Sequence, residues 1–261
     1  MSLNRIKAVL LQEFFITKDL TVMMDLPFLS IVTIIMFGFV SIFLTGTASF
    51  VVARYLLVGA LLWDVLRIAQ YSMSVEALWN IWSRNLCNMF IAPMSLAEYI
   101  VAQMISGAIK AILIFTITTL IIFIGFNFNI LSLGIFNLIL FLINLIIFSW
   151  SSGMIILGII FRYGTRLQAL AWGLIALLQP LTAAFFPVRI LPQYLQTIAY
   201  LFPPTYIFEA ARANISNTAT NWNLIGIAFI ENIVYFIISA WFINLMFRNS
   251  RKLGQFSSNE Q

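Results

Sequence analysis

The sequence predicts an all-α integral membrane protein with about six transmembrane helices. Hydrophobic residues make up 62% of the chain, and Asp, Glu, Lys and Arg together make up only 9%, whereas about a quarter of a soluble domain is charged. So few charges could not cover a surface that faces water. Lipid, in contrast, accepts apolar side chains on the outside of a protein as well as on the inside.

Six apolar runs reach the length that a bilayer requires, which is roughly 20 residues. They are predicted at residues 26–44, 52–72, 96–124, 130–161, 167–185 and 222–247. Pro27 stands at the start of the first run, where a missing N–H costs little. The third and fourth runs exceed the minimum length, which predicts that they are tilted, broken or extended beyond the bilayer. Residues 26–247 therefore form one transmembrane domain, followed by a tail at 248–261.

Residues 1–25 have two faces at helical spacing. The apolar face consists of Leu3, Ile6, Leu10 and Phe14. The opposite face carries Arg5, Gln12 and Asp19. The charges that interrupt this segment argue against a cleavable signal peptide. The pattern instead predicts an amphipathic helix at the inner membrane interface.

The basic residues predict the orientation. With both termini in the cytoplasm, the inner segments hold nine of them: Arg5, Lys7, Lys18, Arg84, Arg162, Arg166, Arg248, Arg251 and Lys252. The outer segments hold three, Arg54, Arg189 and Arg212. This bias predicts cytoplasmic termini. The basic residues are spread along the chain rather than clustered, which predicts no nucleic-acid partner.

The chain lacks residues on which several classes of enzyme and metal site depend. The chain has one cysteine, Cys87, and no histidine, which excludes an intrachain disulfide, histidine catalysis and histidine metal ligation. No metal site or catalytic residue is predicted. An intramembrane enzyme would depend on a pair such as Ser106 and Lys110, a spacing that arises easily by chance. A secondary transporter or channel is the stronger alternative, but no inverted repeat is visible.

Residues 73–95 are predicted to form a cytoplasmic loop that contains a short helix. An apolar stripe at spacings of three and four consists of Trp79, Trp82, Leu86 and Phe90. Arg84 falls beside this stripe. Exposed aromatic side chains on a cytoplasmic helix are costly unless a partner buries them, which predicts a docking surface. Alternatively, the helix lies on lipid headgroups with its tryptophans as anchors. The segment FRYGTRLQ, with Arg162 and Arg166, either makes a second contact or only anchors the protein through the positive-inside bias.

Four charged residues fall inside the predicted spans, where an unpaired charge is costly: Asp64, Arg67, Lys110 and Glu231. Asp64 and Arg67 are three residues apart and are expected to pair. Lys110 needs a partner or must snorkel, and Glu231 is a partner that a long lysine could approach. These residues either line a translocation path or hold the helices together.

Residues 186–221 are too short and too broken to span twice, yet too apolar for a solvated loop. Pro192, Pro203 and Pro204 divide this outer segment, which predicts two short helices, near 190–201 and 205–214, that dip back into the outer leaflet. Glu209 and Arg212 are three residues apart and are expected to bond to each other or to cap helix ends.

Two of these segments resemble the ABC-2 type exporter permeases. LPQYLQTIAYLFPPTYIFEAAR, which includes Tyr206, is similar to the family's LP…P-x-T-Y…E-x-x-R segment, and NIWSRNLCNMFIAPMSLAEYIVAQ is similar to the family's loop between the second and third spans. The resemblance covers nearly the whole chain in order and spacing. It implies a six-span permease of the bacterial cytoplasmic membrane, in contact with lipid and paired with a second permease subunit.

The resemblance also implies a division of labour. A separate ATPase subunit would bind ATP and magnesium, the loop with the aromatic stripe would dock into it, and the 186–221 segment would cap the outer end of the pathway. Exported substrates in the family include drugs, lipids and lipid-linked glycans. The sequence agrees on one point, because it has no G-x-x-x-x-G-K-[ST] phosphate loop and so predicts no ATP site or other cofactor in this chain.

Overall fold

The computed structural model describes residues 2–18, 20–47, 50–83, 94–216 and 219–252. These residues form helices joined by short turns, without a strand among them. The α-helices are α1 (Leu3–Lys18), α2 (Leu20–Thr47), α3 (Phe50–Trp82), α5 (Leu96–Phe126), α6 (Ile135–Tyr163), α7 (Ala169–Leu181), α8 (Gln193–Ala199), α9 (Pro203–Ser216) and α10 (Trp222–Lys252). The short 3-10 helices are η1 (Ile130–Leu133), η2 (Gly164–Leu167) and η3 (Val188–Ile190).

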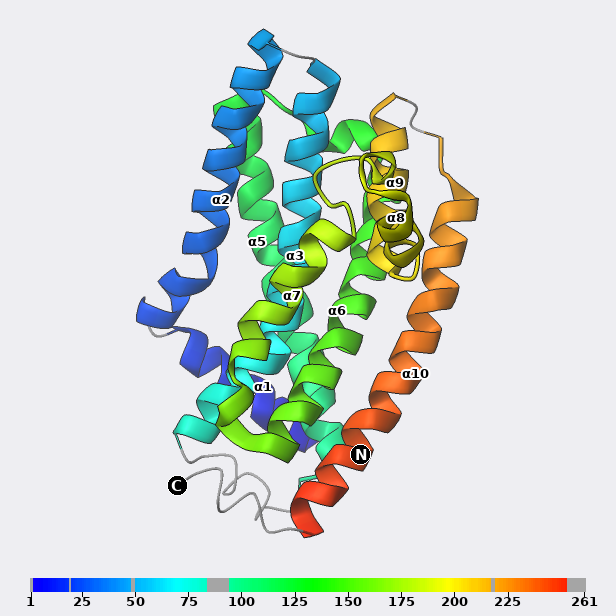
Figure 1. Ribbon diagram of the computed structural model, residues 1–261. Helices are drawn as coiled ribbons and strands as arrows, with labels where there is room; N and C mark the ends of the chain where they lie inside the picture. The colour runs from blue at the N-terminus through cyan, green and yellow to red at the C-terminus, as the bar shows by residue number, and fades with distance from the viewer. Residues whose placement is uncertain (1, 19, 48–49, 84–93, 217–218, 253–261) are drawn as a thin grey trace.

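The long helices run side by side in alternating directions (Figure 1). α3 lies at the centre, in contact with α2, α5 and α6, and α6 in turn packs along α10. One end of the bundle holds α1, the end of α3, the start of α5, the turn between α6 and α7, and the end of α10 (Figure 1). We call this the α1 end and the other the far end. Both terminal helices therefore reach the α1 end.

Small residues allow close approach between the central helices. A Cβ atom on Gly107 of α5 would lie 3.0 Å from the Ala69 carbonyl oxygen of α3. One on Gly153 of α6 would lie 2.8 Å from the Met73 Cβ atom. Tight contact of this kind replaces the hydrophobic driving force that is missing between helices in lipid. The core accordingly centres on α3, which is buried along most of its length.

Three predicted spans match observed helices closely. The runs at 96–124, 130–161 and 222–247 correspond to α5, to η1 with α6, and to α10. α10 continues to Lys252 and so includes the start of the predicted tail. α2 begins at Leu20, so Pro27 lies inside a helix rather than at its start. The rest of the predicted tail, from residue 253, lies outside the described residues.

The second and fifth spans differ from the prediction. α3 continues unbroken to Trp82, so the predicted loop at 73–95 is helical in its first part. Glu76, a polar residue of that predicted loop, accepts a hydrogen bond from Lys110 of α5 instead. α7 ends at Leu181 and has only 13 residues. Pro180 lies in its last turn, where the helix ends.

By length and apolar composition, four helices in the described part of the chain could cross a membrane: Pro27–Gly46 within α2, α5, α6 and α10. α3 is long, but it carries Arg54, Asp64, Arg67 and Glu76. α7, with 13 residues, is too short to cross a bilayer as one helix. The structure therefore supports a multi-pass, all-helical membrane protein, while the count of six spans stays a prediction.

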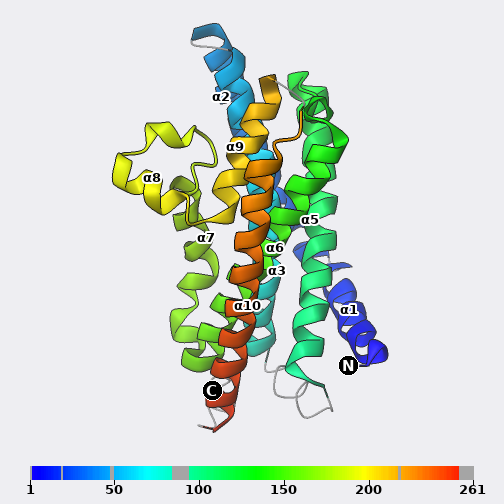
Figure 2. The ribbon, with the colours of Figure 1, turned by 90° about the vertical axis from the view of Figure 1, so that its right-hand side faces the viewer.

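The segment after α7 has an unusual course. α7 runs from the α1 end to the middle of the bundle, and α9 continues from the middle to the far end, packed against α3, α6 and α10 (Figures 1 and 2). Between them, η3 and α8 project sideways (Figure 2). α7 and α9 are therefore two separate helices that follow one another along the length of the bundle. The position of α8 and α9 in the outer leaflet stays a prediction.

Candidate functional site

The end of α3 presents two exposed tryptophans. Trp79 is 61% exposed and Trp82 is 40% exposed, and their rings pack edge to face with centroids 5.1 Å apart. Trp82 also stacks on Trp172 of α7 at 6.1 Å, and the Trp172 indole donates a hydrogen bond of 2.8 Å to the Tyr71 hydroxyl. The other predicted members of this surface, Arg84, Leu86 and Phe90, lie outside the described residues.

The start of α5 is fixed to the start of α1. Ser95 and Glu98 form a capping box at the first turn of α5, in which each side chain accepts a hydrogen bond from the other residue's backbone N–H. The same Glu98 carboxylate accepts a hydrogen bond of 2.6 Å from the Ser2 backbone N–H and lies 3.5 Å from the Arg5 guanidinium. A cap of this kind satisfies backbone donors that the helix leaves open. Here it also anchors α1.

Asp64 and Arg67 form the ion pair that their spacing predicts. The Arg67 Nε atom lies 3.0 Å from the Asp64 Oδ1 atom, and the Arg67 Nη2 atom donates a further hydrogen bond of 2.8 Å to the Ser30 hydroxyl of α2. The pair therefore links α3 to α2 in the interior. This geometry stabilises the contact between two helices, and it also places polar atoms at mid-bundle.

Lys110 does not pair with Glu231, so that expectation is wrong. Its ammonium lies 2.6 Å from the Glu76 Oε1 atom of α3 and 3.7 Å from the Glu13 Oε2 atom of α1. Glu231 lies on α10, and its Oε2 atom is buried without a hydrogen-bond partner among the described residues. Glu231 was considered because it is the other unpaired charge inside the predicted spans. The actual partners lie in the segments taken as an interfacial helix and a loop.

Glu13 carries a sequence signal that was overlooked. The buried side of α1 consists of Ile6, Val9 and Glu13, which recur at helical spacing. Glu13 therefore continues an apolar stripe and is only 3% exposed. Phe14, on the predicted apolar face, is exposed and does not pack on the bundle. A lone acid on the packed face of a helix indicates a buried basic partner, because an unpaired buried charge is costly.

In the outer segment, Arg212 and Glu209 join α9 to the chain that follows α7. Arg212 is 5% exposed. Its guanidinium lies 3.0 Å from the Glu209 carboxylate and donates hydrogen bonds to the Ala183 and Ala184 carbonyls at 3.0 and 3.3 Å. Glu209 accepts a further bond of 2.8 Å from the Val188 backbone N–H. Burial lowers the pKa of Arg212, and the Glu209 carboxylate opposes this shift.

The prolines and Tyr206 shape the turn into α9. Pro192 precedes α8 as its N-cap residue. Pro203 and Pro204 occupy the first turn of α9, where a missing N–H costs nothing. The Tyr206 hydroxyl donates a hydrogen bond of 3.0 Å to the Tyr200 carbonyl. The side chains of Tyr206, Glu209 and Arg212 all hydrogen-bond to backbone groups of the chain between α7 and α9.

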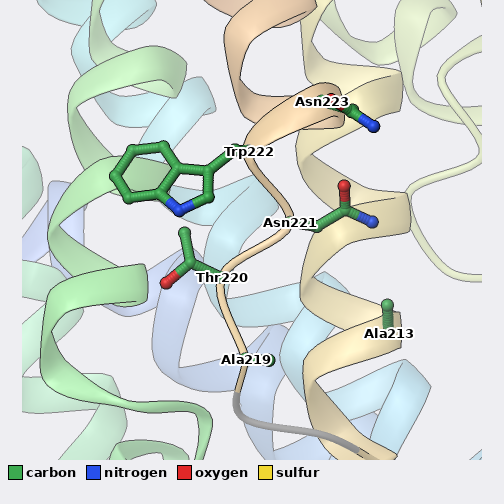
Figure 3. A pocket seen from close by; sticks show the side chains of 6 residues that line it. All are labelled: Ala213, Ala219, Thr220, Asn221, Trp222 and Asn223. Carbon is green, nitrogen blue, oxygen red and sulfur yellow. The ribbon is translucent and has the colours of Figure 1, made fainter.

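Two open pockets lie near α9. One, of about 370 Å³, is bordered by Tyr55, Arg189, Glu209 and Arg212 among others. The second, of about 440 Å³, lies beside the turn into α10 and is lined by Ala213 and residues 219–223 (Figure 3). In the second pocket the Trp222 ring points toward α6, where its centroid is 5.9 Å from that of Phe136.

The long apolar helices and the buried ion pairs between them define a multi-pass helical membrane protein. Residues 17–216 match the ABC2_membrane family model, described as ABC-2 type transporter, so the chain belongs to the ABC-2 type transporter family. The match runs from the end of α1 to the end of α9. A comparison with curated proteins finds no matching relative. The family supports a permease subunit of an ABC transporter, with an ATPase as partner.

Proposed function

We propose that this chain is the permease of an ATP-driven exporter that moves an amphiphilic substrate, such as a drug, a lipid or a lipid-linked glycan, out of the cytoplasm. The family match over residues 17–216 carries this proposal. Two permease subunits, identical or different, would work with two separate ATPase subunits that bind ATP and magnesium. The absence of a phosphate-loop motif from the 261 residues supports a separate motor.

The proposed location is the bacterial cytoplasmic membrane, with the α1 end in the cytoplasm. The inner excess of basic residues supports this orientation. The arrangement of the helices agrees with it, because α1 and the end of α10 lie at the same end of the bundle (Figure 1). A cysteine introduced at Thr220, at the opposite end, should react with an impermeant reagent added to intact cells. Reaction of Cys87 but not of residue 220 would contradict the orientation.

The proposed contact with the ATPase is the end of α3 and the segment that follows it. Trp79 and Trp82 support this assignment because they are large, apolar and exposed at the α1 end. Side chains of this type commonly act as anchors when a partner buries them. Arg84, Leu86 and Phe90 would extend the same surface. The alternative is that the tryptophans rest on lipid headgroups and bind no protein.

Pull-down of the ATPase subunit in detergent tests this contact. Trp82→Ala should reduce recovery of the ATPase about 30-fold, since an interface anchor is worth ~2 kcal/mol and each 1.4 kcal/mol is tenfold. Trp241→Ala is the matched control, because Trp241 is an exposed tryptophan on α10, away from this surface. Equal recovery by all variants would contradict the docking role. Failure of the wild type to recover an ATPase would contradict the proposed partnership itself.

A further inference from the structure

Glu13, Glu76 and Lys110 bring two carboxyl groups to one ammonium group, from three different helices. Lys110 lies 2.6 Å from Glu76 and 3.7 Å from Glu13. The side chains of these three residues are 13%, 15% and 4% exposed, for Lys110, Glu76 and Glu13 respectively. We call them the acid–lysine cluster. It is the point at which α1, α3 and α5 meet through charged groups.

The polar neighbours of the acid–lysine cluster are neutral. Gln103 of α5 donates a hydrogen bond of 2.9 Å to the Glu13 Oε1 atom, and Ser72 of α3 donates one of 2.9 Å to the Glu76 Oε2 atom. The charged groups that act on Glu76 are Glu13 of α1 and Lys110 of α5. Tyr99 is the other titratable side chain of α5 that both carboxylates affect. α6 and α7 also pack on this stretch of α3. The groups that they place there are Gly153 and the Ala171 carbonyl, which are uncharged.

The charges in this cluster do not balance. Two ionised carboxylates and one ammonium would leave a net negative charge in a site with little water, and an uncompensated buried charge is costly. Two carboxyl groups that share a site relieve this cost by keeping one proton. Burial and the neighbouring Glu13 carboxylate raise the pKa of Glu76, which lies beyond the predicted span at 52–72, while the Lys110 ammonium opposes the shift.

We propose that the acid–lysine cluster is a proton-binding site, in which Glu13 and Glu76 share one proton taken from the surrounding water, and that this proton keeps α1 docked on the bundle. With the proton bound, one carboxylate faces one ammonium and the cluster is neutral. Without it, the second carboxylate is repelled by the first. Glu13 is the residue that moves away on release, because it belongs to α1, whose buried face is short.

Infrared spectra of the purified full chain in lipid nanodiscs test the shared proton directly. At pH 7, the wild type should show a protonated-carboxyl band that both Glu13→Gln and Glu76→Gln lose, because each variant leaves one carboxylate paired with Lys110. Asp64→Asn is the matched control and should retain the band, because Asp64 already has its own arginine. A wild-type band unaffected by Glu76→Gln would overturn the proposal, as would a band lost in only one of the two cluster variants.

The pH dependence of thermal unfolding provides a second readout. A carboxyl group whose pKa is raised by folding contributes stability that is complete below its unfolded pKa, ~4.3, and that is lost as pH rises toward the folded pKa. The wild-type midpoint should therefore fall from pH 5 through the neutral range, by roughly 3 °C per pH unit. Glu13→Gln should flatten this fall and keep the protein folded. A fall of equal slope in both proteins would overturn the proposal.

Discussion

Arg212 shows how a single side chain holds the outer segment together. It is 5% exposed and contacts Glu209 and two carbonyl groups that follow α7. We predict that Arg212→Ala lowers the free energy of unfolding by about 3 kcal/mol, because it leaves a partly buried carboxylate and two carbonyls without their partner. Arg189→Ala, at an exposed neighbouring position, should change it little. Thermal unfolding in detergent measures both, and equal stability of the two variants would contradict this role.

At the residue scale, local spacing predicted pairs within one helix but not pairs between helices. Asp64 with Arg67 and Glu209 with Arg212 are each three residues apart, and both pairs are present. The partners of Lys110 were missed, because they lie on other helices at sequence separations that no local pattern reveals. Glu13 could have been identified from its place on the buried stripe of α1.

The packing of α3 against the chain that follows α7 depends on Gly59. A Cβ atom on Gly59 would lie 2.2 Å from the Ala184 carbonyl oxygen, which is backbone and cannot rotate away. We predict that Gly59→Ala displaces this segment and lowers the free energy of unfolding by about 1–3 kcal/mol, a usual cost of overpacking.

Gly173 of α7 is the matched control, because a Cβ atom there meets nothing within 4 Å. Gly173→Ala should leave stability unchanged or raise it by up to about 1 kcal/mol, since alanine is the better helix former. Thermal unfolding of the two variants side by side distinguishes the positions. An equal response would mean that the contact between Gly59 and Ala184 does not limit packing.

At the element scale, hydropathy located the long apolar helices α5, α6 and α10 but misjudged the limits of α3 and α7. α5, α6 and α10 begin and end near their predicted limits. α3 was cut short in the prediction because its last turns carry Glu76 and Asn80, which are polar yet paired inside the bundle. The fifth span was predicted to reach residue 185, whereas α7 ends at Leu181. The apolar residues after Leu181 form a turn that Arg212 holds by hydrogen bonds.

At the scale of the whole molecule, the two ends of the bundle have different features. The α1 end holds Trp79 and Trp82 and is near the acid–lysine cluster, whereas the far end holds α9 and the turn into α10 with the exposed Trp222 (Figures 1 and 2). In the proposed orientation, this polarity puts Trp79 and Trp82 on the same side of the membrane as the ATPase subunit. The family could be predicted from sequence because its motifs lie in connecting segments. The substrate could not, because apolar composition accommodates many amphiphiles.

ATP hydrolysis by the purified proteins tests the central claim most directly. The chain on its own should hydrolyse no ATP, and hydrolysis should appear when it is purified together with a separate ATPase subunit and should be inhibited by removal of magnesium. The physical reason is that no segment of the 261 residues has the phosphate-loop sequence that cradles nucleotide phosphates. ATP hydrolysis by the single purified chain, or the absence of an ATPase from the purified complex, would contradict the assignment.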